Sequence, residues 1–153
     1  MSDVDVVRRA YAALGAGDLD TLESMFARDA VWVMPGTSAI SGVHRGWPEI
    51  RDEFIALLGP LSCGTLHAEL IDVAVGEHYL VVIQRTSGVL KGRSLDVTSC
   101  QLVKMRHGLI TEVSGLYTAD QLAAIDDLDT GVRGGPEPEQ ITRAAFGRDI
   151  PEA

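Results

Sequence analysis

The sequence predicts an α+β domain in which three N-terminal helices pack on a strongly curved, mostly antiparallel sheet. Two observations predict this class. Apolar residues recur at helical spacing up to Pro60, and beyond it they alternate with polar residues, as in half-buried strands. Helices segregated from an antiparallel sheet are typical of α+β folds. A bent sheet around helices encloses a cone-shaped pocket, unless side chains fill it.

The three helices are predicted from apolar stripes and from their start and stop signals. The first covers Val4–Leu14 and ends at Gly15, and the second, Leu19–Phe26, is capped by Asp18. The third opens with Pro48, which a first helical turn tolerates. Its buried stripe consists of Ile50, Phe54, Leu57 and Leu58.

One short strand precedes the third helix and four longer strands follow it. The short strand, Ala30–Met34, is rich in β-branched and aromatic residues and ends at Pro35-Gly36, and a loop at 37–46 follows it. The long strands, separated by glycine-containing turns, are Thr65–Val75, Tyr79–Leu90, Arg93–Met105 and Leu109–Tyr117. A brief helical segment, Ala119–Leu128, completes a predicted domain of residues 1–128.

Residues 129–153 are predicted to be an acidic C-terminal extension that packs over the pocket or over a partner subunit. Within it, Glu139–Phe146 fits a last short helix. The two cysteines, Cys63 and Cys100, lack CxxC spacing and are expected to be free thiols in the core.

Composition restricts the partners and the location. With 13 Lys and Arg against 22 Asp and Glu, the net charge is −9 among the 153 residues, and the longest basic run is Arg8-Arg9. We therefore exclude nucleic acid and anionic membranes as partners. The acidic N-terminus lacks the features of a signal peptide, and no apolar run approaches the ~18 residues of a membrane span, so a cytoplasmic protein is expected.

Three segments, Tyr11–Leu19, Ala30–Gly36 and Gly42–Gly46, resemble the SnoaL-like proteins of the nuclear transport factor 2-like (NTF2-like) superfamily. The hairpin Lys104–Glu112 is similar to that family's R-x-x-D-G-x-I-x-E turn. The resemblance extends from Val4 to Leu128 and implies the cone-shaped fold. It also implies a homodimer formed through the sheet, which the apolar outer face (Val81, Ile83 and Leu102) supports. The superfamily includes isomerases, cyclases, dehydratases, epoxide hydrolases and non-catalytic binders, so the fold alone does not select a function.

The catalytic positions of two family branches are changed here. Relative to the ketosteroid isomerases, Met34 resembles the general-base Asp in position, Gln101 the oxyanion-hole Asp, and Tyr11 lies next to the tyrosine donor. Relative to the limonene-type epoxide hydrolases, the Tyr and Asn that hold the water match Trp32 and Met34. Their Arg/Asp pair and last Asp match Val82, Gln84 and Gly115. Both chemistries are therefore disfavoured in their usual form.

Strand alternation predicts which side chains face the pocket. If Val82 and Gln84 face inward, so does Thr86, whereas Arg85 and Asp96 face outward. The predicted lining is apolar with neutral hydrogen-bonding groups, and consists of Tyr11, Trp32, Met34, Gln84, Thr86, Ser99, Gln101 and Tyr117. Val97 and Val113 face inward on the same strands.

Three alternatives concern titratable residues. A one-residue register slip would turn Asp96 inward as a general base. His67 beside Glu69 is either an outward pair or catalytic, and His44 lies in a loop near the pocket mouth. Metal-ligand spacings and nucleotide-binding motifs do not occur, so no metal and no cofactor are expected.

Two hypotheses follow. In the first, a cofactor-independent SnoaL-like cyclase or isomerase binds a hydrophobic, oxygenated molecule of polyketide or terpenoid type, with Tyr11, Gln84, Gln101 and Tyr117 as catalytic residues. Its substrate-binding residues would be Trp32, Met34, Val82, Thr86, Val97, Ser99 and Val113. In the second, the domain is a non-catalytic small-molecule-binding or dimeric interaction module. Epoxide hydrolase and dehydratase activities rank below both.

Overall fold

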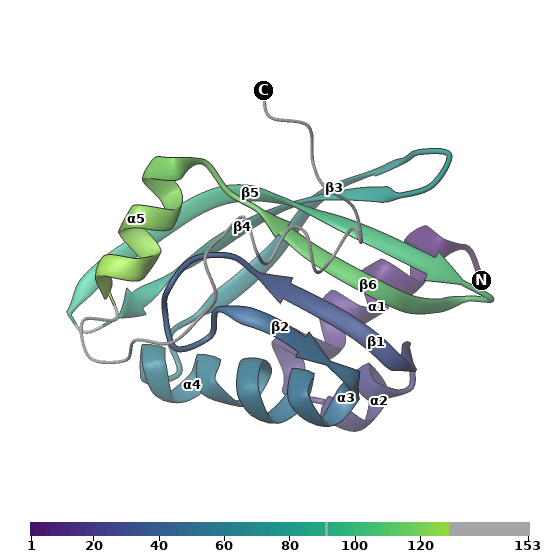
Figure 1. The fold of residues 1–153 in the computed structure, drawn as a ribbon, viewed down its shortest axis with the longest axis horizontal. Helices are drawn as coiled ribbons and strands as arrows, with labels where there is room; N and C mark the ends of the chain where they lie inside the picture. The colour runs from purple at the N-terminus through teal and green to yellow at the C-terminus, as the bar shows by residue number, and fades with distance from the viewer. Residues whose placement is uncertain (91, 129–153) are drawn as a thin grey trace.

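Six strands form a single sheet with the order β2-β1-β6-β5-β4-β3, in a computed structural model that describes residues 1–90 and 92–128 (Figure 1). Only β1 and β6 run parallel, and every other neighbouring pair is antiparallel. The predicted extension 129–153 lies outside the described residues. The strands are β1 (Phe26–Met34), β2 (Gly42–Arg45), β3 (His67–Val75), β4 (Leu80–Leu90), β5 (Arg93–Arg106) and β6 (Leu109–Leu116).

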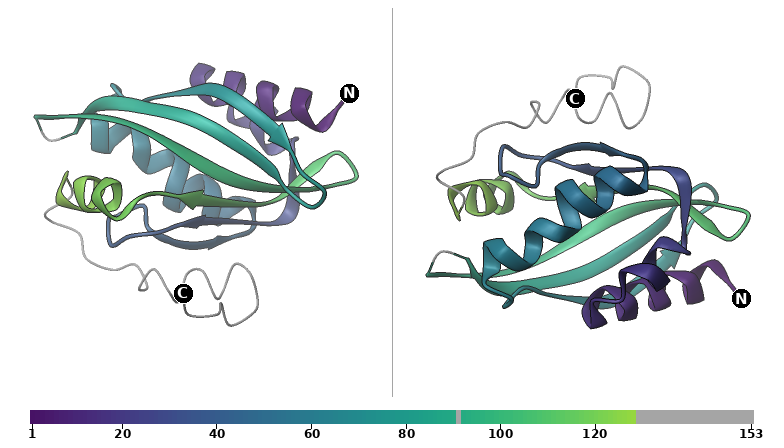
Figure 2. Two further views of the ribbon diagram at one scale, coloured as in Figure 1. Left: turned by 90° about the horizontal axis from the view of Figure 1, so that it is seen from above. Right: turned by 90° about the horizontal axis from the view of Figure 1, so that it is seen from below.

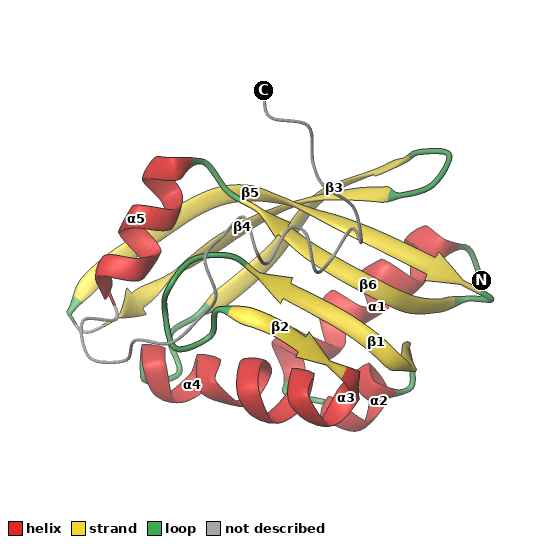
Figure 3. Ribbon diagram, viewed as in Figure 1, coloured by secondary structure: helices red, strands yellow, loops and turns green. Residues whose placement is uncertain are grey.

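Two helical segments cover one face of this sheet (Figures 2 and 3). The first is α1 (Asp3–Ala16), whose start is fixed by a capping box between Ser2 and Asp5, with the short α2 (Leu19–Glu23) after it. The second is a continuous helical segment made of α3 (Gly46–Glu49), the π-helical η1 (Ile50–Ile55) and α4 (Ala56–Ser62). Helices packed on one face of a curved sheet confirm the predicted α+β, NTF2-like fold class.

Bulges and pairing shifts bend the sheet around the helices. Register shifts occur in β3 between Leu70 and Asp72 and in the β5–β6 pair at Lys104 and Met105. The parallel β1–β6 pair shifts as well. An extra residue on one strand bends that strand and increases its twist, so the long strands coil over the helices instead of forming a flat sheet.

The structure differs from the predicted elements near the first strand and in the third helix. Phe26 begins β1 instead of ending a helix, and residues 42–45, expected as loop, form β2 against β1. The third helix continues through Pro60 to Ser62. These short elements depend on tertiary partners, because a four-residue strand has too few residues for an alternation pattern.

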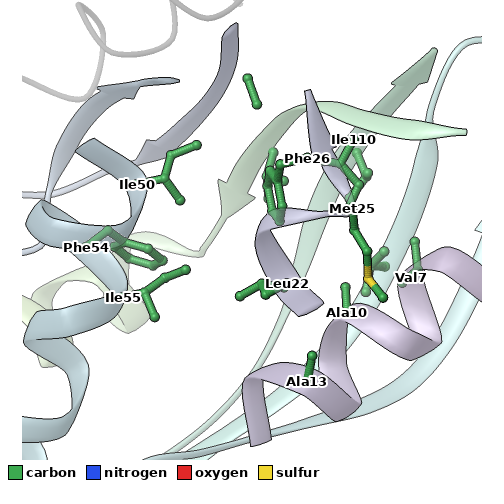
Figure 4. Packing of buried hydrophobic residues seen from close by; sticks show 14 of the residues in the cluster. Val7, Ala10, Ala13, Leu22, Met25, Phe26, Ile50, Phe54, Ile55 and Ile110 are labelled. Carbon is green, nitrogen blue, oxygen red and sulfur yellow. The ribbon is translucent and has the colours of Figure 1, made fainter. Parts of the chain in front are cut away.

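Buried side chains fill the space between α1, α2 and the near ends of β1 and β6 (Figure 4). The Met25 side chain extends there toward Val7 and Ala10 of α1, and Phe26 and Ile110 belong to the same cluster. On the other side, the π-helical turn carries Ile50, Phe54 and Ile55, and the ring centroid of Phe54 lies 4.8 Å from that of Trp32. The cone is therefore packed solid at one end.

The opposite end of the cone is covered by α5 (Ala119–Leu128). Thr118 and Gln121 cap this helix reciprocally, and Gln121 Nε2 also donates to the carbonyl oxygen of Thr98 on β5 at 2.7 Å. Asp126 Oδ1 accepts a hydrogen bond from the Thr37 backbone N–H at 3.0 Å. Gly36, with φ +99°, permits this contact, since a Cβ there would lie 2.6 Å from Asp126 Oδ1. These contacts fix α5, which places Ile125 over the cone.

Candidate functional site

A cavity of about 120 Å³ lies between the concave face of the sheet, the two helical segments that cover it and α5. Its wall is almost entirely apolar. The helical segments contribute Leu14, Phe54, Ile55 and Leu58, and α5 contributes Ile125. No Asp, Glu, Lys, Arg or His of residues 1–90 and 92–128 lines it. Such a cavity excludes charged ligands, because a buried ion without a partner is strongly destabilised.

Eight of the predicted site residues line this cavity. They are Tyr11, Trp32, Met34, Gln84, Thr86, Val97, Gln101 and Tyr117. The other three, Val82, Ser99 and Val113, face the same interior and are buried, but they are not part of its lining. Val82 and Val113 belong to the packed core, where neighbouring side chains leave no space for a ligand.

Tyr11 and Gln84 form a hydrogen-bonded pair that links α1 to β4, the strand next to the β3 edge of the sheet. The Tyr11 hydroxyl donates to Gln84 Oε1, and Gln84 Nε2 donates to Thr86 Oγ1 at 3.3 Å. Since the Tyr11 proton is already engaged, its oxygen can offer a ligand only an acceptor. Two of the four side chains that we expected to be catalytic are therefore hydrogen-bonded to each other.

Ser99, Gln101 and Tyr117 form a second polar group, which is not internally satisfied. The Gln101 side chain is 6% exposed, and neither its Oε1 nor Ser99 Oγ has a hydrogen-bond partner in the described part of the chain. Gly115 pairs with Gln101 across β5 and β6 and leaves room for the Tyr117 ring, since a Cβ at Gly115 would lie 2.8 Å from Tyr117 Cε2. This group is the part of the cavity with unused hydrogen-bonding capacity.

Burial keeps both cavity tyrosines protonated. Desolvation raises the pKa of Tyr11 above its ordinary value, and the nearby Tyr117 adds to the shift. Desolvation also raises the pKa of Tyr117, while the neighbouring Ser99 hydroxyl opposes the rise. Both phenols are therefore neutral near pH 7 and do not act as bases, and only the Tyr117 hydroxyl has its proton free to donate to a ligand.

The titratable alternatives lie elsewhere. Asp96 faces outward, where Arg85 donates to it at 2.7 and 2.8 Å and lowers the pKa of its carboxyl. The register slip that would make it a general base is thus wrong. His67 and Glu69 are exposed on β3 and are not part of the lining of this cavity.

His44 is not a loop residue at the pocket mouth, which corrects that expectation. It lies on β2 opposite Trp32 and is 4% exposed, because β2 pairs with β1 and turns the ring toward η1. Its Nε2 lies 2.9 Å from the Ile40 carbonyl oxygen, and its ring centroid is 5.6 Å from that of Phe54. His44 therefore packs against Phe54, which lines the cavity, and does not line the cavity itself.

The cysteines are free, as expected, but Cys63 is exposed at the left-handed C-cap of α4 and is not a core residue. Cys100 is half-buried.

The sequence analysis did not assign several residues that line the cavity. Leu95 follows the same alternation as Val97, and Phe54 and Leu58 belong to the predicted helical stripe, so a signal existed for these three. The sequence carries no such signal for Ile40 and Ile125. Their positions depend on how two elements fold back over the sheet, the loop before β2 for Ile40 and α5 for Ile125.

Within residues 1–90 and 92–128, no three His, Cys, Asp or Glu side chains gather in a way that could hold a metal ion. In the same part of the chain, every helix is too short or too polar to span a lipid bilayer.

Comparison with known proteins agrees with this architecture. Residues 7–113 match the model of the SnoaL-like domain, so the chain belongs to the SnoaL-like family. It is 34% identical over 120 residues to an uncharacterized protein of Mycobacterium tuberculosis, Rv0034. That alignment covers 76% of this chain and 88% of the mycobacterial protein.

Solved structures show the same fold. Bal32a, from a soil-derived mobile gene cassette, is 30% identical with a TM-score of 0.76 over 82% of this chain and 95% of its own. An NTF2-like protein of Burkholderia xenovorans is 22% identical, with a TM-score of 0.65 over 80% and 93% of the two chains. A putative polyketide cyclase of Sinorhizobium meliloti is also 22% identical, with a TM-score of 0.63 over 76% and 100%. At 22% identity, these last two likenesses show the fold alone, which is that of the NTF2-like protein.

The two cavity glutamines should respond oppositely to the same substitution. Gln101→Leu removes a buried amide without a hydrogen bond, so we expect the free energy of unfolding to rise by about 1–3 kcal/mol. Gln84→Leu leaves the Tyr11 hydroxyl without its acceptor and should lower it by about 1–3 kcal/mol. Urea denaturation at pH 7 measures both, and changes of the same sign would contradict the assignment of satisfied and unsatisfied groups.

The raised pKa values of the tyrosines should make stability fall at alkaline pH. Below a pH of about 10, the phenols are protonated in the folded and the unfolded chain, and their contribution to stability is fully present. As pH rises further, the unfolded chain loses these protons first, so each tyrosine removes about 1.4 kcal/mol per pH unit until its folded-state pKa is passed. Urea denaturation between pH 8 and 11 should therefore show a shallower fall for Tyr117→Phe than for the wild type. Equal slopes would show that Tyr117 is not desolvated.

Proposed function

We propose that this SnoaL-like domain binds a neutral, hydrophobic, oxygenated small molecule in the cavity and promotes its cyclisation or isomerisation without a cofactor. The observation that carries the proposal is the unsatisfied Gln101 amide beside the neutral Tyr117 phenol in an otherwise apolar cavity. A natural domain retains an uncompensated buried amide at a cost to stability, which a function in ligand binding would explain. The putative polyketide cyclase among proteins of this fold supports the substrate class.

The proposed chemistry uses hydrogen bonds and orientation instead of a charged base. Tyr117 would donate to a ligand carbonyl oxygen, and Gln101 Oε1 would accept from a ligand hydroxyl or enol. A preorganised donor toward a developing oxyanion contributes about 2.7–4 kcal/mol in enzymes studied by mutagenesis. Holding two ends of a flexible molecule in contact adds to this effect by reducing the entropy lost in the reaction.

An intramolecular aldol addition fits these groups. The enol carbon attacks a ketone carbon of the same molecule and forms one carbon–carbon bond. The enol O–H breaks, the enol carbon–oxygen bond becomes a carbonyl, and the proton passes to the new alkoxide oxygen. Atoms and charge balance without an oxidant, a reductant or an added water.

Non-catalytic binding is the second candidate function, and the composition of the cavity favours it. Efficient proton abstraction commonly uses a carboxylate or an imidazole with a pKa near the working pH, and the described lining contains neither. Such a binder would use the same hydrogen bonds to Gln101 and Tyr117 but would not accelerate a reaction.

Binding can be tested with a matched pair of neutral ligands, 4-ethylphenol and ethylbenzene. We expect the wild type to prefer the phenol by about 2–10-fold, which corresponds to one net hydrogen bond. The more stable Gln101→Leu should bind both equally. Calorimetric titration measures both affinities. Equal affinities in the wild type would refute the proposed recognition.

Catalysis is tested on the same proteins by following the cyclisation of a linear 1,3,5-triketone above its rate in buffer. We expect Tyr117→Phe to lower kcat about 100-fold with little change in KM. Tyr79→Phe, outside the cavity, should leave both constants unchanged. Binding without any rate acceleration would select the second candidate function.

We also propose that the outer face of the sheet pairs two copies of the chain. An apolar band crosses three strands there and consists of Val81, Ile83, Cys100, Leu102 and Leu116. The exposed Arg85–Asp96 ion pair lies beside it. Apolar bands with polar borders are typical of protein interfaces.

Light scattering after size exclusion tests the pairing. The wild type should give twice the chain mass of 16.4 kDa, and Ile83→Asp/Leu102→Asp should give the chain mass, because it places charges in the apolar band. Thr98→Asp, exposed on the same face outside the band, is the matched control. A wild type of 16.4 kDa would refute the dimer.

A further inference from the structure

A second cavity, of about 350 Å³, adjoins the first between the C-terminal end of α1 and α4. The two cavities share part of their walls, so the same side chains lie at the boundary between them. These shared residues are Leu14, Ile55, Leu58, Leu66 and Ala68. The polar group of Gln101 and Tyr117 lies in the inner cavity, and the second, here called the outer compartment, has neither residue in its lining.

Four glycines border the outer compartment. Gly15 and Gly17 border it from the end of α1, and Gly59 and Gly64 border it from α4 and the turn after it. A Cβ would meet no atom within 4 Å at any of these four positions. The neighbouring atoms therefore leave space for a larger side chain at the border of the compartment.

The chemistry of the outer compartment suits an uncharged chain. Apart from His67, its described lining has no titratable side chain. The one hydroxyl group of this described lining belongs to Ser62. It already donates to the Leu58 carbonyl oxygen at 2.7 Å and accepts from the Leu66 N–H at 3.1 Å. The compartment therefore offers mainly dispersion contacts and the removal of apolar surface from water.

The size of the inner cavity points to a ligand that extends beyond it. About 120 Å³ is similar to the ~150 Å³ of an engineered protein cavity that holds benzene, whereas sites for larger ligands commonly reach ~300–1,000 Å³. We propose that the outer compartment is a subsite for the neutral, apolar chain of an elongated ligand, whose hydroxylated or carbonyl-bearing head occupies the inner cavity. This inference rests on the proposed function and names the substrate class more narrowly.

A series of 4-alkylphenols with chains from ethyl to nonyl tests the subsite. Each methylene that leaves water should tighten Kd about fourfold. In the wild type we expect this gain to continue past the length that fills the inner cavity. Calorimetric titration at one pH and one salt concentration gives Kd for each ligand.

Gly15→Leu and Gly59→Leu would block the compartment without straining the backbone, because neither glycine has a positive φ, in contrast to Gly17 (φ +67°) and Gly64 (φ +76°). We expect these variants to bind 4-ethylphenol like the wild type but to gain nothing from longer chains, a loss of more than tenfold for the nonyl compound. Ala12→Leu, on the exposed side of α1, is the matched control and should follow the wild type.

The outcomes separate this inference from the proposed function. If the wild type binds 4-ethylphenol in a Gln101-dependent way but longer chains add no affinity, the outer compartment is not a subsite and the proposed function stands. The same conclusion follows if Gly15→Leu and Gly59→Leu leave the chain-length dependence unchanged. If 4-ethylphenol itself does not bind, the proposed function fails.

Discussion

The structure depends on one constraint, the requirement that polar groups inside an apolar cavity find hydrogen-bond partners. Tyr11 and Gln84 meet it by bonding to each other, which joins α1 to β4 and fixes the separation between this helix and the sheet. An unmade hydrogen bond at this depth costs about 1–3 kcal/mol. Sliding α1 along the sheet would therefore lose more than apolar packing, so the position of the helix and the shape of the cavity are determined together.

Gln101 is a cavity residue that does not meet this requirement, because its Oε1 has no hydrogen-bond partner in the described residues. It lies in the same concave face as Gln84 but one strand further along, where no described side chain reaches its Oε1. Gly115 on the neighbouring strand provides no side-chain partner and instead admits the Tyr117 ring. The result is a rigid apolar wall with two neutral groups still free to bond. We expect the domain to be less stable than one with an entirely apolar wall. In return, the wall keeps groups that can form hydrogen bonds with a ligand.

The sequence predicts the facing of the long strands well, because the tight turns of antiparallel hairpins leave little freedom in register. Gln84 and Gln101 point inward and Asp96 points outward, as alternation requires. Alternation does not predict depth. Val82 faces the same interior as Gln84, yet it lies in packed core, because Met25, Phe26 and Ile110 fill that end of the cone. Contacts between distant segments decide this, as they decide the formation of β2 and the position of Ile125.

The character of the cavity also limits the chemistry that can occur in it. Desolvation raises the pKa of both phenols, and the nearest carboxylate of the β4–β5 hairpin, Asp96, is held outside by Arg85. A substrate must therefore supply its own acidity, as an enolisable polycarbonyl compound does, or undergo no reaction at all. Catalysis and simple binding then use the same residues and differ only in the reactivity of the bound molecule. For this reason the same glycine-bordered outer compartment serves either function, since its role is to receive the rest of the ligand.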